Sequence, residues 1–181
     1  TLSLSLVSAV GFAAEPSPFP VVPDAEGDKL MVSATNPYVS STGYSILKQG
    51  GIAIDAMVAV SFAISVLRPQ STGLGGGGFL LYREEKTGEV TAYDFRERAP
   101  EKATTHMFLD EEDQPKDFTY KGVVIPKASQ NGHLSIGVPG LVAGLLKAHK
   151  EHGSMPLQVL LQPAINFAEK GFPIYLSLIH I

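Results

Sequence analysis

The apolar residues between positions 36 and 66 recur at the three- and four-residue spacing that is typical of α-helices. A first helix is predicted to begin near Asn36 and to end at the glycine pair 50–51. Its packed face comprises Val39, Gly43, Ile46 and Leu47. A second helix is predicted over 52–66, ended by Arg68-Pro69, and it is apolar on nearly every side. Such a helix is expected to be buried.

A β-hairpin is predicted from the apolar runs 79–82 and 90–93, which flank a polar turn at 83–88. Residues 75–78 are all glycine and lead directly into the first of these strands. Glycine weakens a strand and packs nothing, so it is best tolerated where backbone or a ligand approaches closely. We therefore expect a crowded site beside this hairpin.

Two further helices are predicted in the second half, over 139–152 and from about 154 to 171. The packed face of the first helix is predicted to comprise Val142, Leu145, Leu146 and His149. The packed face of the second is predicted to comprise Leu157, Leu160, Leu161, Ala164, Ile165 and Ala168. Pro163 should kink the second. Residues 135–138 suggest a strand. His149 and His152 lack a third metal ligand nearby, and are interpreted as a capped, solvated helix end.

The remaining segments are predicted from composition. Residues 1–14 resemble the apolar part of a secretory signal peptide without its basic start, and 15–30 form a proline-rich tether. Residues 110–113 form an acidic turn that lacks the oxygen spacing of a calcium loop. Residues 114–131 are expected to be a polar surface excursion.

The overall composition is that of an ordinary soluble domain, with 44% apolar and 18% charged residues in 181. The net charge is −4 with scattered basic residues, so we expect neither a nucleic acid nor a membrane surface as partner. No segment is long enough to span a bilayer. The absence of cysteine excludes a disulfide, a thiolate metal site and a cysteine nucleophile in this stretch.

Two charged positions have alternative interpretations. Asp55 could favour the positive end of the helix dipole or act as a buried carboxylate with several donors, and the first is preferred. Arg96, delivered with Asp94, Glu97 and Arg98 to one end of the hairpin, could bind a carboxylate through its planar fork. The alternative is an Arg-Glu ion-pair cluster that only closes the loop, and spacing alone favours it.

Several spaced blocks resemble the start of the large subunit of γ-glutamyltranspeptidases and together cover 31–172. The blocks are 31–34, 46–56, 73–79, 94–100, 137–140, 163–165 and 171–172. Members of the family usually carry Asn at the position of Ile52, so a side-chain hydrogen bond made there is in doubt in this chain. Residues 31–175 are accordingly interpreted as the N-terminal part of a large subunit.

The resemblance implies a mixed α/β fold, one part of an αββα sandwich of the N-terminal-nucleophile hydrolase type. It implies a precursor that cleaves itself into two subunits, a threonine nucleophile on the small subunit, and no cofactor or metal. The activity implied is γ-glutamyl transfer from glutathione and similar amides to water, amino acids or dipeptides. Arg96 matches the position that grips the substrate α-carboxylate, with Glu97 as a weaker candidate. No catalytic residue is expected in this stretch, which by itself should be inactive.

Other functions remain open at this point. A relative in the same superfamily hydrolyses glutaryl or β-lactam amides, and a secreted homologue without catalysis is a further alternative. A phosphate-binding module is disfavoured because the glycines precede a strand and no Gly-Lys-Ser/Thr follows. If the signal peptide is real, the protein is periplasmic or secreted.

The last six residues, 176–181, depart from the family pattern. The bases CTGTCTCTTATACACATC would encode them, and that string resembles a transposon-end sequencing adapter. We therefore predict that this tail is not native.

Overall fold

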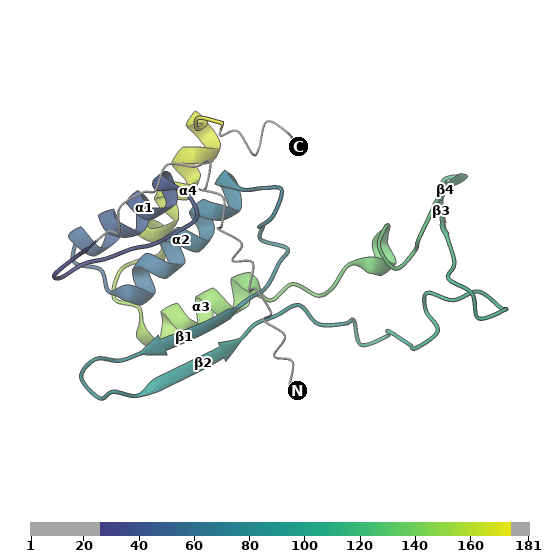
Figure 1. The fold of residues 1–181 in the computed structure, drawn as a ribbon, viewed down its shortest axis with the longest axis horizontal. Coiled ribbons are helices and arrows are strands. Elements are labelled where there is room, and N and C mark those ends of the chain that lie inside the picture. Colours follow the sequence, from purple (N-terminus) through teal and green to yellow (C-terminus); the bar gives the residue numbers. More distant parts are fainter. Residues whose placement is uncertain (1–25, 175–181) are drawn as a thin grey trace, which may run out of the picture.

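Three helices form the larger part of the body in the computed structural model, which describes residues 26–174. Helix α2 (Ala53–Leu67) lies between α1 (Pro37–Lys48) and α4 (Leu157–Lys170), and it also contacts α3 (Leu141–His152) (Figure 1). The largest fully buried side chains include Val39, Ile46, Ile54, Val58, Leu67, Leu145 and Leu160. All four predicted helices are therefore confirmed, and the nearly all-apolar α2 is the buried one.

Local sequence explains where these helices begin and end. The Asn36 side chain accepts a hydrogen bond from the Val39 N–H at 3.0 Å and caps α1. Ile52 stands at the start of α2 and has no side-chain acceptor, so this helix lacks the corresponding cap. Helix α4 runs through Pro163 without interruption and ends at Gly171, whose φ of 76° suits glycine.

The predicted hairpin is also confirmed. Strands β1 (Phe79–Arg83) and β2 (Val90–Asp94) pair antiparallel, with Leu81 opposite Ala92. Helix α3 covers one face, where the His152 ring lies 4.7 Å from the Tyr82 ring and Tyr93 is buried. On the opposite face Phe79, Leu81 and Val90 are 67%, 75% and 59% exposed. The chain thus builds helices on one side of a sheet whose other face is open and largely apolar, with Arg83 and Asp94 at its ends.

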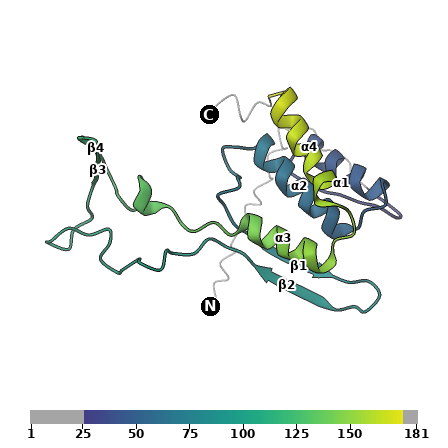
Figure 2. The same ribbon diagram turned by 180° about the vertical axis from the view of Figure 1, so that it is seen from behind.

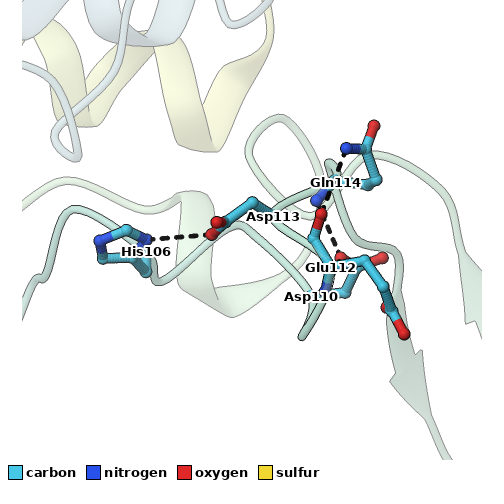
Figure 3. Close-up of polar contacts among 5 residues, drawn as sticks. All are labelled: His106, Asp110, Glu112, Asp113 and Gln114. Carbon is cyan, nitrogen blue, oxygen red and sulfur yellow. Dashed lines mark hydrogen bonds and ion pairs between the residues drawn. The ribbon is translucent and has the colours of Figure 1, made fainter.

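A long arm, residues 99–137, leaves the body at the end of β2 and returns at α3 (Figures 1 and 2). It carries a second hairpin, β3 (Phe118–Tyr120) with β4 (Val123–Ile125), and the short 3₁₀-helix η1 (His133–Ser135). The sequence interpretation missed the hairpin. The acidic segment is a turn as predicted: Asp110 Oδ1 accepts from the N–H groups of Glu112 and Gln114, and His106 pairs with Asp113 (Figure 3).

Two local predictions are wrong. Residues 135–138 are not a strand, because only Val138 pairs, with Arg98, and the Gly140 N–H at the next ladder position donates to Gly76 instead. The end of α3 is not solvated, since His149 and His152 are both half-buried. His149 Nε2 donates to the Met155 carbonyl at 2.8 Å, and His152 packs on the two hairpin tyrosines.

The buried stripe of α3 also differs from the predicted one. It comprises Gly144, Leu145 and Ala148, whereas Leu146 is 37% exposed. Phe95 packs against α3 at Gly144, a close contact that the apolar spacing alone did not reveal.

The predicted signal peptide at 1–14, most of the tether and the predicted tail at 176–181 lie outside the described residues. Within 26–174, no helix combines the length and the apolar character that crossing a bilayer requires.

Candidate functional site

The glycine run is crowded where it meets the chain leaving β2. Gly78 and Phe95 exchange two backbone hydrogen bonds, of 3.4 and 3.1 Å, which extend the hairpin by one pair. A Cβ on Gly77 would lie 2.6 Å from the Phe95 carbonyl oxygen and 2.8 Å from the Glu97 nitrogen. Because both neighbours are backbone atoms, neither can move aside easily. The predicted close approach of backbone at these glycines is confirmed.

The start of α3 completes this crowded region from the other side. The Gly76 carbonyl accepts from the N–H groups of Gly140 and Leu141, at 3.1 and 2.9 Å. A Cβ on Gly140 would overlap the Phe95 carbonyl, and a Cβ on Gly144 would overlap the Phe95 ring. Two segments distant in sequence, the glycine run and the start of α3, therefore converge on Phe95.

The residues after Phe95 are held by backbone and by Asp94. The Asp94 carboxylate accepts from the Arg96 N–H at 3.1 Å. Arg98 and Val138 exchange two backbone hydrogen bonds of 3.2 and 2.8 Å, at the base of the arm. The short segment that carries Arg96 is thus fixed at both ends while its side chain is exposed.

A pocket of 260 Å³ opens beside this segment. Its charged lining residues are Asp94, Arg96, Arg98 and Lys147, so positive charge exceeds negative charge by two. Pro139, Ala143 and Gly144 supply part of its apolar wall. Arg96 forms no ion pair with any residue of 26–174, so the ion-pair cluster that spacing favoured is absent from this part of the chain. An unpaired arginine beside further cations is suited to an anionic group such as a carboxylate.

Glu97 points elsewhere. Its side chain lines a neighbouring pocket with Ala103, Met107 and Ile136, and it lies against Gly76 and Gly137. The structure therefore brings Asp94 and Arg96 together but does not bring Glu97 into their pocket. Lys147, which does line that pocket, was missed because nothing in the local sequence of α3 marks one exposed lysine among others.

Tyr93 and Glu151 connect β2 to α3 behind the pocket. The Tyr93 hydroxyl donates to Glu151 Oε2 at 2.7 Å, and Lys147 Nζ lies 5.9 Å from the Tyr93 ring. Burial, together with the hydrogen bond and charge of Glu151, raises the pKa of Tyr93 to about 12. Tyr93 is therefore a neutral donor that helps to fix the strand against the helix.

Asp55 stands in the first turn of α2, as the preferred interpretation expects, and it is also the buried carboxylate of the alternative. It is 0% exposed and accepts hydrogen bonds from the N–H groups of Ile52, Ser154 and Met155 and from the Ser154 hydroxyl. Burial acts to raise its pKa, but the bonds from Ser154, Ile52 and Met155 outweigh it, and the net pKa is lowered. The carboxylate therefore fastens the start of α2 to the loop between α3 and α4.

Comparison with known proteins places these features in a family context. The sequence profile of the family described as gamma-glutamyltranspeptidase matches residues 39–180. The glutathione hydrolase proenzyme of Escherichia coli K12 is 46% identical over 142 residues, which are 78% of this chain and 23% of that protein. The chain thus spans about a quarter of the length of such curated relatives.

Solved structures show the same relationship. The γ-glutamyltranspeptidase of Helicobacter pylori superimposes with a TM-score of 0.76 at 40% identity, covering 87% of this chain and 42% of that one. The cephalosporin acylase of Bacillus halodurans superimposes with a TM-score of 0.66 at 28% identity, covering 91% of this chain and 29% of that one. The predicted mixed α/β fold of the N-terminal-nucleophile type is therefore confirmed.

Proposed function

Because the chain belongs to the γ-glutamyltranspeptidase family, we propose that it forms the N-terminal part of the large subunit of an enzyme that transfers γ-glutamyl groups. The donors are glutathione and other γ-glutamyl amides, and the acceptors are water, amino acids or dipeptides. This proposal is supported by the profile match over 142 residues and by relatives that are named glutathione hydrolase proenzymes.

The observation that carries the substrate assignment is the Arg96 guanidinium at the edge of the 260 Å³ pocket, which forms no ion pair with the residues of 26–174. A γ-glutamyl group presents an α-carboxylate at its amino-acid end. The planar fork of arginine donates two parallel hydrogen bonds to such a carboxylate. Asp94 holds the backbone N–H of Arg96 and orients the segment. Glu97 stays a weaker candidate because its side chain lines the neighbouring pocket.

In this proposal the bond-breaking group comes from polypeptide beyond this chain. A threonine at the new N-terminus of a small subunit attacks the γ-amide carbonyl, and its own amine removes the hydroxyl proton, because a hydroxyl is a weak nucleophile without a base in reach. The resulting acyl-enzyme is released by water or an amino-acid acceptor. The residues of this chain bind and orient the donor, and the 181-residue chain alone is inactive. No cofactor takes part.

The partner is the small subunit made from the same precursor, with which the large subunit forms a heterodimer. The open face of the β1–β2 hairpin supports this, since Phe79, Leu81 and Val90 would otherwise remain in water. The apolar start of the sequence supports a periplasmic or secreted location.

Arg96→Lys in the full-length precursor tests the substrate assignment. Lysine keeps the charge but loses the bidentate fork, and a charged hydrogen bond contributes about 1.5–3 kcal/mol. We expect KM for a γ-glutamyl p-nitroanilide donor to rise roughly tenfold to a hundredfold. The matched control is Arg83→Lys, at the exposed end of β1 and outside this pocket, which should leave KM unchanged. An unchanged KM in Arg96→Lys would refute the role.

A second function, hydrolysis of glutaryl or β-lactam amides, is favoured by the likeness to a cephalosporin acylase. Its donors lack the α-amino group of glutamate. Comparing hydrolysis of glutaryl and γ-glutamyl p-nitroanilides by the purified, self-cleaved enzyme separates the two functions. Faster turnover of the glutaryl compound would favour the acylase.

A further inference from the structure

Four glycines lie directly against Phe95 and form what we call its glycine socket, residues 77, 78, 140 and 144. Its ring would collide with a Cβ on Gly144 of α3, and a Cβ on Gly78 would lie 3.0 Å from its Cε2. Its carbonyl oxygen faces Gly77 and Gly140, where a Cβ would also come too close. At Gly77, Gly140 and Gly144 a Cβ would force Phe95 to move, and at Gly78 the ring would have to shift by a few tenths of an ångström.

The direction of the neighbouring Arg96 side chain depends on the position of Phe95. Arg96 is exposed and makes no ion pair with other residues of 26–174, so its own contacts do not fix its direction. Its backbone, by contrast, follows directly from Phe95, whose N–H and carbonyl both hydrogen-bond to Gly78. A small shift of Phe95 would therefore move the Arg96 guanidinium at the pocket edge, where the geometry of a bidentate bond is demanding.

We propose that Phe95 is a positioning residue that, through its glycine socket, aims Arg96 at the donor α-carboxylate. This inference rests on the proposed function of Arg96 and adds the residue through which the fold controls it. Phe95 lines the same 260 Å³ pocket, but its hydrocarbon ring offers no hydrogen-bond donor to a carboxylate. The glycines at 77, 78, 140 and 144 are accordingly required as a set, because 77 and 140 make room for the Phe95 carbonyl and 78 and 144 for its ring.

A positioning role differs measurably from a purely structural one. Loss of structure lowers the amount of active enzyme and affects all donors alike. Misdirection of Arg96 weakens only donors that carry an α-carboxylate. The diagnostic quantity is the ratio of kcat/KM for γ-glutamyl p-nitroanilide to kcat/KM for 4-aminobutanoyl p-nitroanilide, the same donor without its α-carboxylate.

The test uses the full-length precursor with Phe95→Leu, which removes the ring, and with Gly78→Ala, a milder displacement. We expect the donor ratio to fall roughly tenfold in both through a higher KM, with kcat changed less than about twofold. Phe62→Leu, the same change on the half-buried side of α2, is the matched control and should leave the ratio unchanged. Gly78→Ala keeps the test valid if Phe95→Leu does not accumulate as folded protein.

Arg96→Lys, measured in parallel, distinguishes failure of the Phe95 positioning role from failure of the proposed function of Arg96. If Arg96→Lys lowers the donor ratio but neither Phe95→Leu nor Gly78→Ala does, the positioning role is overturned and the proposed function stands. If Arg96→Lys also leaves the ratio unchanged, the proposed function of the pocket fails, and the inference fails with it.

Discussion

Replacing Asp55 by asparagine tests how the helices that support the site are fastened together. Asp55 Oδ1 accepts from the N–H groups of Ser154 and Met155, at 3.0 and 3.2 Å, and Oδ2 accepts from the Ile52 N–H at 2.9 Å and from the Ser154 hydroxyl. Asparagine has nearly the same shape but replaces one acceptor oxygen with an NH₂ group. The change therefore alters hydrogen bonding with little effect on packing.

The cost follows from counting the donors that lose their acceptor. With its oxygen toward Ser154 and Met155, the new amide can donate to the Ser154 hydroxyl, but it faces the Ile52 N–H with a second donor. An unsatisfied buried donor costs about 1–3 kcal/mol, and bonds to a charged acceptor are stronger than those to a neutral one. We expect a local loss of about 2–4 kcal/mol.

Hydrogen exchange of the Ser154 and Met155 amides in the full-length precursor measures this loss directly. The expected change corresponds to exchange that is faster by a factor of roughly 30 to 1,000. Asp110→Asn is the matched control, because exposed Asp110 accepts two backbone bonds through one oxygen that asparagine retains. Exchange at 154 and 155 that changes no more in Asp55→Asn than in the control would refute the reasoning.

The same carboxylate predicts a pH dependence. Its pKa in the folded protein is below the ordinary value of 3.8, because the bonds from Ser154, Ile52 and Met155 outweigh the effect of burial. The stabilisation is therefore fully present above pH 3.8 and is lost as the pH falls through the folded pKa. Asp55→Asn should abolish this acid-dependent part of the exchange rates.

Two further predictions concern the glycine run and the open sheet face. Gly77→Ala should lower the yield of folded precursor, because the new Cβ would conflict with the Phe95 backbone. Gly75→Ala should be tolerated, because no atom outside its chain neighbours lies within 4 Å of its Cβ. Equal amounts of soluble precursor from the two variants, compared on a denaturing gel, would contradict this. Leu81→Lys, at a side chain 75% exposed in this chain, should reduce self-cleaved, two-subunit protein, because lysine would be buried against the covering polypeptide. Unchanged cleavage would show that this face stays in water.

The helices and the first hairpin could be predicted because their signals are local. The spacing of apolar residues in α2 and α4 and the two strands around the polar turn at 83–88 are each complete within one segment. The glycine run also predicted a close approach of backbone. It did not predict that Phe95 is the residue against which the glycines pack.

The features that sequence did not reveal depend on distant partners or on short segments. Ser154 and Met155 lie 99 and 100 residues from Asp55, so nothing near Asp55 shows that it is surrounded by donors. The β3–β4 hairpin has strands of three residues, too short for a periodic pattern. Gly122 did offer a sequence signal for the turn of this hairpin, because glycine adopts positive φ readily. In the structure Lys121 and Gly122 have φ of 48° and 80°, as a tight hairpin turn requires.

A crystal structure of the full-length enzyme with bound L-glutamate tests the central claim most directly. The account predicts that both oxygens of the α-carboxylate lie within about 3 Å of the Arg96 guanidinium nitrogens, in a bidentate pair. Glutamate bound with its α-carboxylate away from Arg96 would contradict it.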